Sequence, residues 1–124
     1  MKKVLIIIIL FTVIMSCESI LVELDRNYIE VDYNKQEIVI NANRSLSKIS
    51  SNYHDEIITL MDGTYSVSLE WFKAKLDKHR RYFTVYLEEN DSEDDRTVEI
   101  YGYYKGGSDF VKIVQKAKPK KIEN

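Results

Sequence analysis

The sequence predicts an all-β domain, an immunoglobulin-like β-sandwich of about seven or eight antiparallel strands, preceded by a lipoprotein signal peptide. The first observation is composition: nine tyrosines, but only four glycines and one proline, accompany many β-branched residues, which suit a pleated, half-buried surface. The second is that short alternating runs recur between turns at intervals of about 8–12 residues. The third is that these runs have no convincing helical period. A small β-barrel is the nearest alternative.

Four strands are expected in the first half of the domain. In the first of them, Ile29 and Val31 fall on one side and Glu30 and Asp32 on the other, as in a half-buried strand. The fourth is a more continuous apolar run that ends at Asp62-Gly63, a dipeptide suited to the positive φ of a tight hairpin turn. The predicted ranges are Tyr28–Tyr33, Glu37–Ala42, Leu46–Ser50 and Glu56–Met61.

The strands of the second half alternate more clearly. In Tyr82–Glu88, phenylalanine, valine and leucine alternate with tyrosine and threonine, and Arg96–Tyr104 has a similar pattern. Such strands are typical of antiparallel sheets with one face on the core and the other in water. Lys105–Ser108 contains two glycines and predicts a turn. The predicted ranges are Thr64–Leu69 with an extension to Leu76, Tyr82–Glu88, Arg96–Tyr104 and Asp109–Gln115.

The first sixteen residues have the pattern of an export signal. Two lysines follow Met1, and Val4–Met15 is apolar except for Thr12, which matches the charged and apolar regions of such a signal. A membrane-spanning helix needs about 20 apolar residues, so this run is too short to span a bilayer comfortably. We therefore expect a targeting segment that is removed on export.

The sequence Ile14-Met15-Ser16-Cys17 places an aliphatic residue, a variable position and a small residue before a cysteine. It resembles the lipobox of bacterial lipoproteins. The resemblance implies cleavage before Cys17, a diacylglycerol thioether on its sulfur and stable attachment by two or three acyl chains. The alternative is an uncleaved N-terminal helix with Cys17 as an ordinary thiol. The chain has a single cysteine, so no intramolecular disulfide is possible.

The chain thus divides into four predicted parts. Residues 1–16 are the signal peptide, 17–27 the lipidated cysteine with a short tether, 28–116 the β-sandwich, and 117–124 a basic tail that we expect to be disordered. The signal contains two of the 18 basic residues and none of the 20 acidic ones, so the mature chain has a formal charge of −4. This charge does not favour nucleic-acid binding. The expected location is the cell envelope, attached by lipid, with the outer membrane favoured and the leaflet left open.

In the C-terminal half, Trp71-Phe72 is followed by the alternating strand Phe83–Leu87, by Asn90, by Arg96 at the start of the next strand, and by the last strand Val111–Gln115. This order resembles BACON-type domains (Bacteroidetes-associated carbohydrate-binding often N-terminal) over about half of the mature chain. The N-terminal half departs from the family, because it lacks the proline and glycine residues that usually mark the turns between strands. The loop between residues 43 and 55 also looks longer.

The resemblance implies structural roles for four residues: Trp71, Asn90, Arg96 and Gln115. We expect the indole to cap the sandwich core, the asparagine to occupy a turn, the arginine to bridge loop carbonyls and the glutamine to bond across the end of the sheet. Trp71 is also a possible sugar platform, but its place in an apolar strand favours the core.

No residue pattern marks catalysis or a resident metal. His54 and His79 lie far apart, without a cysteine or histidine at ligand spacing, so we expect neither zinc nor thiol chemistry. No pair of carboxylates stands out for glycoside hydrolysis. The acidic run Glu88–Asp95 contains oxygen ligands but lacks the glycine and regular spacing of a calcium loop, which favours a solvated hairpin loop. The sequence predicts no cofactor and no enzyme.

Four tyrosines are the candidate ligand contacts. Tyr82 and Tyr86 share one face of a predicted strand, and Tyr101 and Tyr103 share one face of the next. If these faces coincide, they form one aromatic patch on which sugar rings can stack. The alternative is cross-strand tyrosine pairs that stabilise a solvated face by roughly 0.2–1 kcal/mol each.

Two functions follow as hypotheses. The first is a non-catalytic binding or adhesion lipoprotein of the cell envelope with a glycan as its possible ligand, a suggestion that comes from the family resemblance. The second is a structural or accessory lipoprotein that docks on another envelope protein through a strand edge or through the face of Tyr101 and Tyr103.

Overall fold

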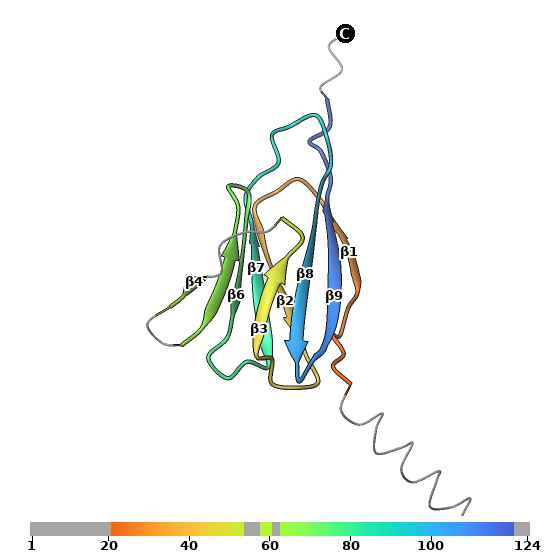
Figure 1. Ribbon diagram of the computed structural model, residues 1–124. Coiled ribbons are helices and arrows are strands. Elements are labelled where there is room, and N and C mark those ends of the chain that lie inside the picture. The colour runs from red at the N-terminus through yellow and green to blue at the C-terminus, as the bar shows by residue number, and fades with distance from the viewer. Residues whose placement is uncertain (1–20, 54–57, 61–62, 121–124) are drawn as a thin grey trace, which may run out of the picture.

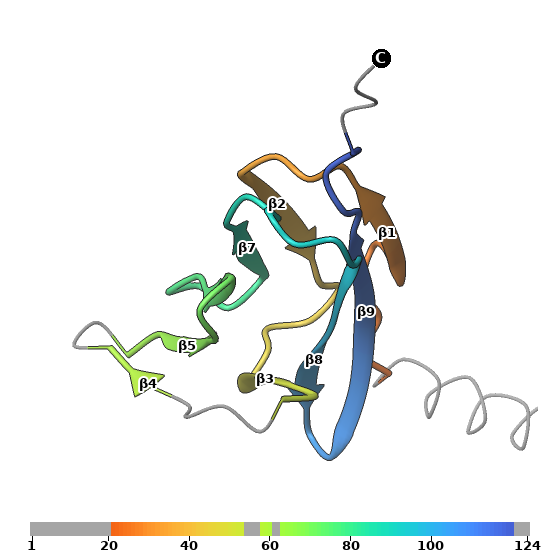
Figure 2. The ribbon, with the colours of Figure 1, turned by 90° about the horizontal axis from the view of Figure 1, so that it is seen from above.

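The computed structural model describes residues 21–53, 58–60 and 63–120. The predicted signal peptide, the lipidation site Cys17 and Asp62 lie outside the described residues. Two β-sheets face each other as the layers of a sandwich (Figures 1 and 2). No helix among the described residues is long and apolar enough to cross a membrane.

Nine strands are found in the described part of the chain. One sheet has the order β1-β9-β8-β3 and is called here the β8 sheet; the other has the order β2-β7-β6-β5-β4 and is called the β7 sheet. The strands are β1 (Tyr28–Val31), β2 (Gln36–Asn41), β3 (Lys48–Ser51), β4 (Ile58–Thr59), β5 (Tyr65–Ser68), β6 (Phe72–Leu76), β7 (Tyr82–Leu87), β8 (Arg96–Tyr104) and β9 (Gly107–Gln115).

The predicted all-β, immunoglobulin-like sandwich is confirmed, with two differences in detail. The structure has nine described strands, one more than the eight expected at most, because the run expected from Thr64 to Leu76 is divided into β5 and β6. The expectation of purely antiparallel strands is wrong at one edge, where β1 pairs with β9 in parallel, Ile29 opposite Ile113. Alternation reports which faces are buried but not the direction of a neighbouring strand.

The core lies between the two sheets and follows the alternation in the sequence. In β7 the side chains of Phe83, Val85 and Leu87 are buried, while Tyr82 and Tyr86 point outward. In β8, Val98 and Ile100 are buried in the same way. Every residue of the described core cluster falls within the range from Val22 to Ile113.

The predicted tether, residues 17–27, differs from the structure over its described part. Val22 and Leu24 are buried in the core, and Leu24 forms an antiparallel bridge with Ala42 beside the end of β2. The Leu24 backbone N–H also donates to Asp109 Oδ2 at 2.8 Å. The chain therefore packs against both sheets before β1 begins, and the folded domain starts at least six residues before the predicted boundary at Tyr28.

The glycine turn predicted at 105–108 is tighter than expected, because β9 already begins at Gly107. Lys105 and Gly106 have φ values of 45° and 81°, the positive values that a two-residue hairpin between twisted strands requires. Gly63, the second residue of the predicted Asp62-Gly63 turn, has φ 82°.

Gly102 gives a first stability prediction. It lies in the middle of β8, where a Cβ atom would meet Leu46 Cδ1 at 3.0 Å and Cδ2 at 3.2 Å, and Leu46 is fully buried. Overpacking of this kind costs about 1–3 kcal/mol, so we expect Gly102→Ala to lower the free energy of unfolding by that amount in urea denaturation. Gly102→Ala/Leu46→Ala should lose less stability than the sum of the two single losses predicts; simple additivity would contradict the contact.

Candidate functional site

The four candidate tyrosines do not form one patch. Tyr82 and Tyr86 lie on β7, whereas Tyr101 and Tyr103 lie on β8, in the other sheet. Both pairs point away from the core, so they lie on opposite outer surfaces of the sandwich. The condition for a single aromatic patch, that the two faces coincide, is therefore not met, because the connection 88–95 crosses from one layer to the other (Figure 2).

The outer face of β7 combines exposed tyrosines with two hollows. Tyr82 and Tyr86 are each 37% exposed and lie on either side of Thr84. Tyr82 and Tyr86 both border a hollow of about 200 Å³, and Tyr86 also borders a second one of about 390 Å³. The first is lined by Thr64, Lys75, Asp77, Lys78, Tyr82, Thr84 and Tyr86, and the second by Lys35, Glu37, Leu69, Glu70, Phe72, Lys73, Tyr86 and Glu88.

Strand register places charged groups beside these rings. Tyr86 stands between Glu37 of β2 and Lys73 of β6, and Thr84 has Lys75 as its neighbour on β6. Each tyrosine is thus bordered by groups that donate or accept hydrogen bonds. We name this surface the Tyr82–Tyr86 face; its polar neighbours were missed at the sequence level, although the outward alternation of Lys73 and Lys75 in β6 was a usable signal.

Asp77 organises the end of this face. Its Oδ2 accepts the His79 backbone N–H at 2.9 Å, and this hydrogen bond, with a further one from the Tyr82 hydroxyl, lowers the pKa of Asp77 below its usual range. The hydrogen bond to Asp77 in turn raises the pKa of the Tyr82 phenol. Tyr82 is therefore a neutral donor whose hydroxyl is oriented by a carboxylate.

The outer face of β8 is built differently. The Tyr101 hydroxyl donates to Glu99 Oε2 at 2.7 Å, which raises the pKa of Tyr101, and the Tyr103 hydroxyl pairs with Ser50 Oγ at 2.9 Å. Lys48 lies 4.9 Å from the Tyr103 ring. Both rings are half-buried with their hydroxyls already engaged. We name this surface the Tyr101–Tyr103 face.

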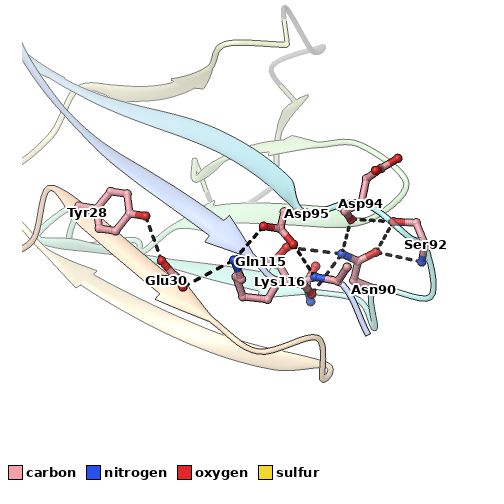
Figure 3. A network of polar contacts seen from close by, with 9 residues as sticks. Tyr28, Glu30, Asn90, Ser92, Asp94, Asp95, Gln115 and Lys116 are labelled. Carbon is pink, nitrogen blue, oxygen red and sulfur yellow. Dashed lines mark hydrogen bonds and ion pairs between the residues drawn. The ribbon is translucent and has the colours of Figure 1, made fainter. Parts of the chain in front are cut away.

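Asn90 and Gln115 lie together at the C-terminal end of the sandwich, and both side chains are fully buried (Figure 3). Asn90 Nδ2 donates to the carbonyls of Asp94, Lys116 and Gln115 at 3.0, 3.2 and 3.4 Å, and its Oδ1 accepts the Ser92 N–H and hydroxyl. Gln115 Nε2 donates to the Glu88 carbonyl at 2.8 Å. The two amides tie the connection 88–95 to the end of β9.

Trp71 and Arg96 form a stacked pair at the edge of the core. Trp71 is half-buried just before β6 and packs against the core cluster, and its ring contacts Phe72 edge-on at 5.0 Å. The Arg96 guanidinium lies 5.5 Å from the Trp71 ring centroid. Arg96 therefore lies against an indole; its role in bridging loop carbonyls stays a prediction.

The basic tail is held against the acidic connection over its described part. Lys118 and Lys120 lie 3.7 and 3.8 Å from the carboxylates of Glu89 and Glu93, and the Ala117 N–H donates to Asp95 Oδ1 at 2.8 Å. Exposed pairs of this kind contribute little individually. No group of three or more metal-ligating side chains occurs within the described ranges.

Asp95 gives a pH prediction. The Ala117 N–H and the Lys116 ammonium lower its pKa, so its stabilising effect is complete above the unfolded value near 4 and disappears as the pH falls through the lower folded value. We expect Asp95→Asn to be less stable than the wild type at neutral pH and to lose less stability on acidification. Urea midpoints measured from neutral pH down to about pH 2 test this; parallel curves for the two proteins would contradict it.

One known structure supports the fold. A protein from Bacteroides thetaiotaomicron, known from an NMR structure, superposes with a TM-score of 0.59 at 12% identity, over 81% of this chain and 90% of that one. A crystal structure of a mutant complex of titin M10 with obscurin-like 1 Ig gives a TM-score of 0.49 at 9% identity, over 81% and 96% of the two chains. No family model and no curated protein matches the sequence.

The described fold therefore defines the protein as a single immunoglobulin-like β-sandwich module. Its resemblance to BACON-type domains stays a prediction, since the similarity at 12% identity concerns the fold alone.

Proposed function

We propose that this protein is a non-catalytic binding module of the cell envelope, held by a lipid on Cys17, and that its Tyr82–Tyr86 face contacts a glycan. The observation that supports the proposal is the pair of exposed tyrosines on β7, separated on the outer face only by Thr84 and bordered by two hollows that meet at Tyr86. Small-molecule sites are usually concave and lined by apolar and aromatic side chains with a few polar groups.

The chemistry of the face suits a sugar. A pyranose presents apolar C–H groups on its ring faces and hydroxyls at its rim. Tyrosine rings offer a large, rigid apolar surface for the former, and Lys75, Glu37 and Lys73 supply donors and acceptors beside the rings. Both hollows are partly open to solvent, which fits a chain of sugars better than an enclosed monosaccharide.

The Tyr101–Tyr103 face supports a second candidate, docking on another envelope protein. Beside it, Phe110 is 42% exposed, with its ring 5.5 Å from that of Tyr101, and Tyr28 on β1 is 57% exposed. Exposed aromatic side chains are enriched in protein interfaces. The tyrosine hydroxyls on this face are already engaged, which favours a flat apolar contact.

A glycan array run with residues 18–124 tests the first candidate, since the described core lies wholly within this segment. We expect binding to at least one glycan class and a loss of about tenfold or more in affinity, about 1.4 kcal/mol, in Tyr82→Ala/Tyr86→Ala. The matched control is Tyr101→Ala/Tyr103→Ala, which removes the same groups from the opposite face. Equal losses of affinity in both variants would contradict the glycan proposal. No binding to any glycan would also contradict it and would favour docking on a protein.

Attachment by Cys17 is tested separately. Cells that express the full chain are fed an alkyne fatty acid, and the protein should take up the label. A Cys17→Ala variant that is still labelled would refute the anchor. Protease treatment of intact cells then reports whether the domain faces the surface or the periplasm.

A further inference from the structure

The two ends of the sandwich carry opposite charge. At one end, called here the basic end, the three connections 43–47, 77–81 and 105–106 contain five cationic side chains and one carboxylate. These are Arg44, Lys78, Arg80, Arg81, Lys105 and Asp77. At the other end, the connection 88–95 contains six carboxylates, which three lysines of residues 116–120 only partly balance.

The three basic connections form one continuous surface. The Leu46 N–H donates to the Arg80 carbonyl at 2.7 Å, and the Ser47 N–H donates to the Tyr103 carbonyl at 2.8 Å. The Ser45 hydroxyl donates to the His79 carbonyl at 3.1 Å. These contacts hold the connections side by side, at the end of the sandwich opposite the C-terminus (Figure 1).

The N-terminal segment enters the domain at this same end. Asn43 Nδ2 donates to the Leu21 carbonyl at 3.1 Å, directly beside Arg44. Leu21 is only four residues after Cys17, so the two residues are at most about 14 Å apart along any path of the chain. A lipid on Cys17 would therefore bring the basic end, and not the acidic one, to the membrane.

The carboxylates near the basic end offset part of its charge. Asp77 and Asp109 accept backbone N–H groups of His79 and Leu24, and Asp25 accepts the Asn41 N–H; all three keep their negative charge. Glu23 adds one further exposed carboxylate. By contrast, Arg81 and Lys105 have exposed side chains and form no ion pair with a described residue.

We infer that the basic end is a docking surface for an anionic lipid bilayer. Lysine and arginine near such a surface each strengthen binding by about 1 kcal/mol, or about fivefold. The inference goes beyond the proposed function. Only the argument about orientation rests on that proposal, because it uses the lipid on Cys17. With the basic end on the bilayer, the outer faces of both sheets are roughly perpendicular to the membrane plane and stay accessible.

Sedimentation with vesicles tests docking on residues 18–124, which lack Cys17, so the result is independent of lipidation. The vesicles contain phosphatidylcholine alone or with roughly one-third phosphatidylglycerol. We expect the domain to bind only the anionic vesicles at about 0.1 M salt and to be released near 1 M, where the Debye length falls from about 10 to about 3 Å.

Paired charge reversals locate the surface. Arg81→Glu/Lys105→Glu should weaken binding by about 25-fold or more, because the loss of each positive charge alone costs about fivefold. Lys118→Glu/Lys120→Glu changes the net charge equally at the acidic end and should leave binding within about twofold. Circular dichroism confirms that each variant is folded. Equal effects of the two variants, salt-independent binding, or no binding of the folded wild-type domain to anionic vesicles would overturn the inference, as would preferential binding to a soluble polyanion.

Discussion

Replacement of Phe83 by alanine is expected to lower the free energy of unfolding by about 3–5 kcal/mol, the usual cost of truncating a buried phenylalanine. Phe83 is fully buried on an inner strand of the β7 sheet, opposite Ile40 of β2 and Leu76 of β6. Because β7 is hydrogen-bonded to β2 on one side and to β6 on the other, the cavity would have little freedom to collapse. Urea denaturation monitored by circular dichroism gives the change.

Tyr86→Ala is the matched control, because Tyr86 lies on the same strand but on the outer face. Its removal should cost no more than about 1 kcal/mol, the value of cross-strand pairs. If Phe83→Ala and Tyr86→Ala were equally destabilising, the assignment of the core to the inner face of β7 would fail.

The second large effect is expected for Asn90→Ala, with a loss of about 3 kcal/mol. A buried polar group left without its partner costs about 1–3 kcal/mol, and the Asn90 amide serves carbonyls of Asp94 and Lys116 as well as the Ser92 N–H. Alanine would remove the partner of these groups at a position where the side chain is fully buried. The connection 88–95 should then lose its attachment to β9, and urea denaturation of the variant and the wild type measures the loss.

Two variants separate this role from a general effect of the loop. Asp91→Ala changes the exposed neighbour of Asn90 and should alter stability by less than about 0.5 kcal/mol. Asn90→Asp keeps the acceptor for Ser92 but loses the donor to the carbonyls, so it should remain strongly destabilising at neutral pH. A mild effect of Asn90→Asp would show that the donated hydrogen bonds contribute little.

Local alternation predicted much of the architecture. β7 and β8 were predicted almost to the residue because each has one apolar and one polar face, and a period of two specifies both the strand and its buried side. Asn90 and Gln115 were singled out by a resemblance; in the structure both are buried donors to backbone carbonyls, and that burial was not evident from an acidic loop and a strand end.

The N-terminal segment was predicted poorly for an equally physical reason. Val22 and Leu24 looked like a tether because they have no strand of their own, yet they are buried by contact with both sheets. The parallel pairing of β1 with β9 depends on residues more than eighty positions apart. Such contacts have no local signal.

The sequence by itself determined which side chains of each strand face the core, because alternation is a property of a few neighbouring residues. It also singled out Cys17 as the predicted lipidation site, through a motif that needs no tertiary context. Only the tertiary structure decided that Tyr82 and Tyr86 lie on one outer surface and Tyr101 and Tyr103 on the opposite one. It alone placed the cationic connections at the end of the sandwich where Asn43 contacts Leu21, since proximity between loops is set by how the two sheets pack.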